Sequence, residues 1–136
     1  DIGLTRAVAQ GDCGVAIVNH YYISRMLAGV NGTRDQRLAN QVKVITPNPA
    51  HVNVSAGGLA KYAQNKTEAI KLLEYLASPT GSSGIAKPTY EHPLNGVNNA
   101  KEVSRFGGFT PDSVTINQLG KFNKKAIKLM TQAGWQ

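Results

Sequence analysis

The stretch GDCGVAIVNHYYISRMLAG, residues 11–29, decides which fold this chain can adopt. CGVAIV (residues 13–18) is a short run of small and β-branched apolar residues, which is typical of a strand buried on both faces of a parallel sheet. From Tyr21 onward, apolar residues recur at helical spacing until Gly29. The stretch therefore predicts a strand that leads directly into a helix, with the adjacent Tyr21 and Tyr22 at the junction.

Two further apolar segments predict short strands. QVKVITPN (residues 41–48) is interrupted by proline, and HVNVS (residues 51–55) leads into a pair of glycines. Together with a short helix expected at residues 2–10, they alternate strands with helices, which indicates an α/β fold. The proline- and glycine-rich segments 47–58 and 88–96 are typical of crossings between two lobes, so we expect part of a larger fold.

The clearest helices are predicted in the second half of the chain. TEAIKLLEYLAS (residues 67–78) has leucines and isoleucine at helical spacing, Thr67 as a candidate N-cap, and a proline after its last residue. PTGSSGIAKP (residues 79–88) is a segment of small residues that leads to the turn-rich YEHPLNGV. VTINQLGKFNKKAIKLMTQAGW (residues 114–135) predicts one or two amphipathic helices.

Composition restricts the class of protein. The chain has 136 residues, 41% of them hydrophobic, which is enough for the core of one average domain. Its formal net charge of +7 is scattered, which is typical of solvated helix faces rather than of a nucleic-acid surface.

The single cysteine, Cys13, excludes an internal disulfide and is expected to be buried. No apolar run reaches the roughly 18 to 20 residues of a membrane span. Because Asp1 opens on what reads as a helix already under way, we expect the later part of a longer polypeptide, without its signal peptide.

Adjacent tyrosines at a helix start allow several kinds of chemistry. Neighbouring helical residues point about 100° apart, yet both hydroxyls can converge from the rim of the first turn. Such phenols can be core aromatics, sugar-stacking rings, a covalent nucleophile or ligands of a hard cation. A phenol with a pKa of about 10 becomes a good ligand only in a strong positive field, which Fe³⁺ supplies. The residue chemistry alone leaves these possibilities open.

The order of the motifs resembles one known family. GDCGVAIVNHYY, then HVNVSAGGLAKYAQNKTEAIKLLEYLASPTG, then YEHPL are similar to the C-terminal part of the bacterial periplasmic ferric-iron-binding proteins, the solute receptors of iron ABC transporters. The cyanobacterial members are the most similar. The resemblance covers roughly residues 1 to 100 and extends more loosely to the C-terminal helices. It implies the two-lobed type II fold of periplasmic binding proteins, of which this chain is about the C-terminal half.

The resemblance also implies the roles of individual residues. Tyr21 and Tyr22 would bind Fe³⁺ as phenolates. Asn19 would hydrogen-bond a synergistic anion or, in the second shell, hydrogen-bond the groups that bind the iron. The remaining ligands, usually another Tyr with a His, Tyr or Glu, would come from earlier in the family's chain, and water can complete the shell. His20 is expected to point away from the iron, His51 and His92 to fix loops, and Glu91 to be exposed or to cap a turn.

The family further implies an organisation and a cellular role. Residues 1–46 would be part of the C-terminal lobe with the Tyr-Tyr site, residues 47–90 a crossover and return segment of the N-terminal lobe, and residues 91–136 a hinge return followed by C-terminal helices. The full-length protein would be a periplasmic monomer that passes ferric iron to an ABC permease in the inner membrane. It would not be an enzyme, would bind no nucleic acid and would have no membrane span.

Two alternatives keep the tyrosine pair but change its use. A receptor of the same fold could carry another cargo, namely an oxyanion, a carbohydrate or a divalent metal. A DNA-nicking enzyme could use a tyrosine nucleophile, but such enzymes need a metal-bound pair of histidines separated by one apolar residue. His20, His51 and His92 are not spaced in that way.

Overall fold

The computed structural model describes residues 1–95 and 98–135, and residues 96, 97 and 136 of the predicted segments lie outside it. The described chain divides into two compact units. The first contains residues 1–45 and 55–108, and the second contains residues 46–54 and 109–136. The chain therefore passes between the units near residues 45, 54 and 108. The lobe assignment of residues 1–46, 47–90 and 91–136 stays a prediction.

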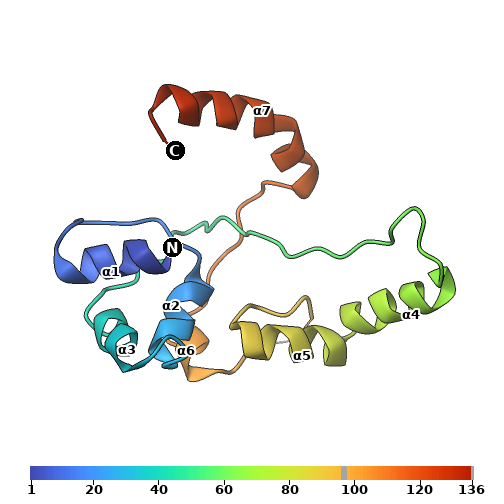
Figure 1. Cartoon of the computed structure of the whole chain (residues 1–136), viewed down its shortest axis with the longest axis horizontal. Helices are drawn as coiled ribbons and strands as arrows, with labels where there is room; N and C mark the ends of the chain where they lie inside the picture. The colour runs from blue at the N-terminus through green and yellow to red at the C-terminus, as the bar shows by residue number, and fades with distance from the viewer. Residues whose placement is uncertain (96–97, 136) are drawn as a thin grey trace. The chain divides into compact units, whose positions relative to one another are not determined.

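Six helices of the first unit follow one another along the chain (Figure 1). The described helices of this unit are α1 (Ile2–Gln10), α2 (His20–Leu27), α3 (Thr33–Ala39), α4 (Lys66–Ala77), α5 (Pro79–Thr89) and α6 (Lys101–Ser104).

The hydrophobic core of the first unit lies where α1, α2 and α3 meet. Met26 is fully buried, and Ile23, Leu27 and Ala39 are each at most 7% exposed. Since Ile23, Met26 and Leu27 are three and four residues apart, they form one face of α2. The predicted helix after the tyrosine pair is confirmed, and this buried face fixes the orientation of its first turn.

The ends of these helices follow from local sequence signals. Gly11 adopts the left-handed conformation, with φ of 83°, and its backbone N–H bonds back to α1. The helix predicted at residues 2–10 and its end at Gly11 are thereby confirmed. In the second unit, Thr115 and Gln118 form a reciprocal capping box that begins α7 (Ile116–Gln132). The amphipathic C-terminal helix is confirmed as a single element.

An ion pair between the exposed Arg6 and the buried Asp35 joins α1 to α3. Arg6 donates from Nε and Nη2 to the two carboxylate oxygens of Asp35, at 2.9 and 2.7 Å. Asp35 is only 2% exposed. The hydrogen bonds from Arg6, followed by its charge, keep the pKa of Asp35 below its ordinary value despite desolvation. The pair therefore holds the two helices in register as long as Asp35 is ionised.

Removal of Arg6 should destabilise the protein at neutral pH and have little effect in acid. Because the folded-state pKa of Asp35 is lowered, the pair contributes stability above the ordinary carboxyl pKa of about 3.9, and this contribution is lost as the pH falls through the lowered value. For Arg6→Ala we expect a reduced Tm at pH 7 and a difference that closes at low pH. Thermal unfolding at several pH values, with the exposed Arg37→Ala as control, measures this. An equal loss of Tm at every pH would contradict the assignment.

The three predicted strands are not formed within residues 1–95 and 98–135. The segments at residues 13–18, 41–48 and 51–55 have no regular structure, apart from a parallel bridge between Ala50 and Pro111 in the second unit. A strand exists only through hydrogen bonds to a neighbouring strand, and the described residues supply no ladder for these segments. As a consequence Val15 and Ile17 are 81% and 87% exposed. The expected burial of Cys13 is also wrong here, since Cys13 is exposed.

The sequence assigned no helix to residues 79–88, and the structure has helix α5 there, because Ser78 caps it by accepting from the Gly81 N–H and Pro79 occupies its first turn. One expectation about a helix end was also wrong. The N-cap of α4 is Asn65 rather than Thr67. The end of α4 at Ser78-Pro79 is confirmed, and α5 starts immediately after it (Figure 1). No helix of the described residues is long and apolar enough to cross a membrane.

Candidate functional site

The tyrosine pair lies in the first turn of α2, directly after Asn19. The rings of Tyr21 and Tyr22 have centroids 4.5 Å apart and are tilted by 38°. A hydrogen bond with the Tyr22 side chain, followed by burial and the nearby charge of Glu91, raises the pKa of Tyr21. The two phenol rings therefore lie side by side at the start of α2, and in the absence of a cation Tyr21 stays protonated at neutral pH.

Ser24 anchors the turn that carries the tyrosines. Its side chain is fully buried, and its hydroxyl lies within hydrogen-bonding distance of the carbonyl oxygens of His20 and Glu102, at 3.2 and 3.1 Å. Glu102 belongs to α6, which packs against α2. The first turn of α2 is consequently tied both to its own helix and to a segment almost 80 residues later, which restricts how far the phenols can move.

His20 ties the same turn to residues 90–92. Its Nε2 lies 3.0 Å from the carbonyl oxygen of Tyr90, and because a carbonyl only accepts, Nε2 carries the proton. The ring also stacks on His92, with centroids 5.0 Å apart. Burial, followed by the charge of His92, lowers the pKa of His20, so its neutral form is favoured. Through this hydrogen bond, His20 holds the backbone of Tyr90 next to the first turn of α2.

Glu91 follows the residue that His20 contacts. Tyr90 has φ of 61°, a left-handed conformation that ends α5. Glu91 is half-buried and accepts a hydrogen bond from the Ser55 hydroxyl at 3.3 Å. The sequence predicted that Glu91 is exposed or caps a turn, and it did not predict the bond to Ser55, which lies 36 residues earlier.

The chain is related along its entire length to proteins named for iron. Iron uptake protein A1 of Synechocystis sp. is 35% identical to it, over 100% of this chain and 39% of that protein. Iron uptake protein A2 of the same organism is 34% identical, over 100% and 41%. The major ferric iron-binding protein of Neisseria meningitidis serogroup B is 26% identical, over 95% and 39%. No family model matches the chain.

A solved structure supports the same relationship. The Bordetella ferric binding protein superposes with a TM-score of 0.87 at 32% identity, over 99% of this chain and 44% of that structure. This chain is a relative of the ferric-iron-binding proteins. It spans less than half of the length of the relatives that it matches, and it has the fold of a partial half of a type II periplasmic binding protein, as the resemblance implied.

Asn19 lies where the ferric-binding resemblance places an anion-binding residue. Its backbone N–H and its Nδ2 both donate to one carboxylate oxygen of Asp1, at 3.1 and 3.3 Å. These donors therefore suit an anionic oxygen next to the tyrosine pair. The assignment of Asn19 to a synergistic anion or to the second shell of iron stays a prediction.

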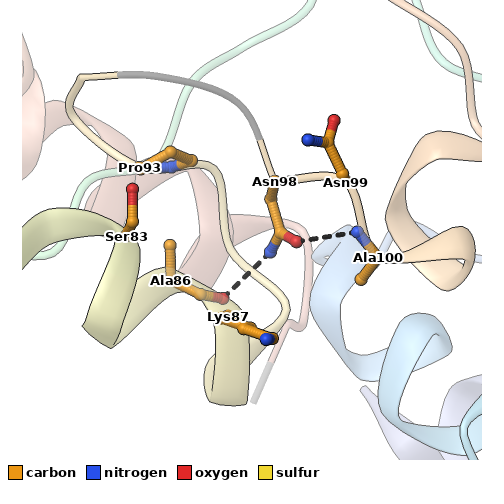
Figure 2. A pocket seen from close by; sticks show the side chains of 7 residues that line it. All are labelled: Ser83, Ala86, Lys87, Pro93, Asn98, Asn99 and Ala100. Atoms are coloured by element: carbon orange, nitrogen blue, oxygen red, sulfur yellow. Dashed lines mark hydrogen bonds between the residues drawn. The ribbon is translucent and has the colours of Figure 1, made fainter. Parts of the chain in front are cut away.

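Asn98 bonds to the backbone of Ala86 in α5 and of Ala100 before α6 (Figure 2). It is 7% exposed, and its Nδ2 donates to the carbonyl oxygens of Ala86 and Glu91 at 3.0 and 2.8 Å. Its Oδ1 accepts from the Ala100 N–H at 3.0 Å. One amide side chain thus joins the end of α5, the Glu91 turn and the start of α6.

Truncation of Asn98 should destabilise the protein by about 2 to 3 kcal/mol, because it removes three hydrogen bonds, those to the Glu91 carbonyl, the Ala100 N–H and the Ala86 carbonyl. Asn98→Ala is compared with the exposed neighbour Asn99→Ala, for which a change within about 0.5 kcal/mol is expected. Urea unfolding measures both. A loss no larger in Asn98→Ala than in Asn99→Ala would show that the bonds of Asn98 do not hold the turn.

A pocket lies next to Asn98. It has a volume of about 350 Å³ and is lined by Ser83, Lys87, Pro93 and other residues of α5 and the 93–100 segment (Figure 2). Among its described lining residues, Lys87 is the only charged one, which does not suit a cation. Within the described part of the chain, no group of three His, Cys, Asp or Glu side chains is placed to hold a metal.

Proposed function

We propose that this chain supplies Tyr21 and Tyr22 as phenolate ligands of ferric iron in a periplasmic solute receptor. The observation that supports the proposal is the pair of adjacent phenol rings, with centroids 4.5 Å apart, at the start of a helix that His20 ties to Tyr90 and Ser24 ties to Glu102. Two hard oxygen donors in one turn suit a hard trivalent cation. The names of the relatives, iron uptake and ferric iron-binding proteins, point to the same cargo.

The rest of the iron shell would come from outside this chain. Two phenolates leave a trivalent ion with one positive charge and open coordination positions, which other protein ligands, water or an anion held by Asn19 would fill. The loaded receptor, a monomer, would close its lobes about the hinge and deliver iron to an ABC permease in the inner membrane. This is a binding and transport role without chemical conversion of a substrate.

Addition of a ferric salt to the natural protein that carries this sequence tests the proposal. Phenolate-to-iron charge transfer should give a red or purple absorption band that saturates at one iron per protein. A protein that stays colourless with ferric citrate would refute the assignment and favour a receptor for an oxyanion, a carbohydrate or a divalent metal.

A further inference from the structure

Two segments that connect the units of this chain pair with each other. The second unit consists of residues 46–54 and 109–136, and both segments are continuous with the first unit. The Ala50 N–H donates to the carbonyl oxygen of Thr110, and the Asp112 N–H donates to the carbonyl oxygen of Ala50, both at 2.8 Å. Backbone segments that are distant in the sequence therefore lie side by side next to the connections between the units.

A side-chain bond between His51 and Asp112 adds to this backbone pairing. Nδ1 of His51 lies 2.9 Å from Oδ2 of Asp112, although the two residues are 61 positions apart. The hydrogen bond from His51, followed by that from the Val114 N–H, lowers the pKa of Asp112. The carboxylate is therefore ionised at neutral pH and accepts, so Nδ1 of His51 carries the proton.

The Asp112 carboxylate has a defined partner for each of its oxygens. Oδ2 accepts from His51, and Oδ1 accepts from the Val114 N–H at 3.0 Å. Val114 directly precedes Thr115, the N-cap of α7. The carboxylate thus holds His51 against the backbone that leads into α7.

The strength of this bond suits a local role rather than a global one. The side chains of His51 and Asp112 are 50% and 22% exposed, and ion pairs this exposed contribute little to the overall stability of a protein. The backbone pairing at Ala50 is an isolated bridge, and such a pairing without a third strand is only marginally stable in water. The His51 bond is therefore large enough to decide how firmly the two segments stay paired.

Pairing of the connecting segments restricts how the chain can bend between the units. Any movement of one unit against the other changes backbone dihedral angles at the connections, as in a hinge. Segment 46–54 joins the first unit at both of its ends, and the segment that starts at residue 109 joins it at one end. Segments that are bonded to each other bend together, whereas unpaired segments bend independently.

We propose that His51 and Asp112 are positioning residues of the hinge, which keep the two connecting segments paired while the receptor closes on its cargo and opens again. This inference rests on the proposed function and goes beyond it. Both residues lie in the second unit, whereas Tyr21 and Tyr22 lie in the first, so the pair acts on the connections and not as a ligand.

Hydrogen exchange in the iron-free natural protein tests the pairing. His51→Phe keeps a ring but removes the Nδ1 donor, and the protection of the Ala50 and Asp112 amides against exchange should fall about fivefold. His51→Asn, which places an amide N–H close to the position of Nδ1, should recover most of the protection. The control is Ser113→Ala, an exposed neighbour of Asp112, which should change neither amide.

A double variant shows whether the two side chains act through each other. Asp112→Ser can still accept from the Val114 N–H but is too short to reach His51, so the Ala50 amide should lose about as much protection as in His51→Phe. The variant with both substitutions should lose no more than either single one. Unchanged protection in His51→Phe, or losses that add in the double variant, would overturn the inference.

Release of ferric iron to citrate tests the hinge role itself. In His51→Phe we expect release about fivefold faster than in the unsubstituted protein, with the charge-transfer band unchanged, because the tyrosines stay in place while the closed receptor opens more readily. An unchanged release rate, or a shifted band, would overturn the hinge role and leave the proposed function intact. If the unsubstituted protein binds no ferric iron, the proposed function fails and the hinge role fails with it, whereas the exchange measurements still decide whether the pair holds the segments together.

Discussion

Tyr21→Phe and Tyr22→Phe should each reduce ferric affinity by more than about 100-fold. Loss of a residue that only supports a metal ligand typically costs 10- to 100-fold in affinity, and loss of an anionic ligand should cost more. Each phenylalanine keeps the ring and its packing, so the fold should be preserved. The double variant should lose the charge-transfer band altogether. Citrate competition measures the affinities, and absorption spectra measure the band.

Two other tyrosines provide matched controls for these variants. Tyr62 and Tyr75 are 79% and 55% exposed, and Tyr75 belongs to α4 rather than to α2. Tyr62→Phe and Tyr75→Phe should bind ferric iron as tightly as the unsubstituted protein. If the double variant of Tyr21 and Tyr22 retains the affinity of these controls, the pair is not the iron site.

Gly81→Ala should destabilise the protein by about 3 kcal/mol, at the upper end of the cost of an overpacked site. A methyl group at Gly81 would collide with the backbone carbonyl of Tyr75. That carbonyl cannot move away easily, because it accepts from both the N–H and the hydroxyl of Ser78, at 3.0 and 2.6 Å. The substitution should therefore push α4 and α5 apart where one helix follows the other. The Ala86 carbonyl, which accepts from the Glu91 N–H, belongs to α5.

Gly84 in the same helix is the control for Gly81. A methyl group there meets nothing within 4 Å. Since alanine favours a helix interior over glycine, Gly84→Ala should stabilise the protein by about 0.5 to 1 kcal/mol. Urea unfolding of both variants should give effects of opposite sign. Similar effects at the two positions would mean that the Tyr75 carbonyl yields without cost.

The sequence predicts the helices of this chain better than its strands, for a physical reason. α1, α2, α4 and α7 satisfy their hydrogen bonds locally, so spacing and end signals such as Gly11 and Ser78-Pro79 are sufficient to predict them. Strands require partners distant in the chain, and the apolar run at residues 13–18 has none among the described residues. Helix α5 was missed because its glycines and prolines are poor helix formers, while the Ser78 cap, its signal, was read only as the end of α4.

The candidate site divides in the same way. Tyr21 and Tyr22 are adjacent, so the sequence was enough to propose them as a pair, and the structure places their rings 4.5 Å apart. Ser55 and Glu91 lie in motifs that the sequence singled out, but their bond to each other joins residues 36 positions apart and follows only from the fold. The left-handed Tyr90 is the least predictable of these features, because few non-glycine residues adopt that conformation.

The location of bound iron tests the central claim most directly. Crystals of the natural protein grown with a ferric salt should be measured at the iron absorption edge, and an anomalous difference map should be calculated. The account predicts one strong peak within bonding distance of the phenol oxygens of both Tyr21 and Tyr22. A fully occupied iron peak elsewhere in the protein, with these two oxygens still hydrogen-bonded to each other, would contradict it.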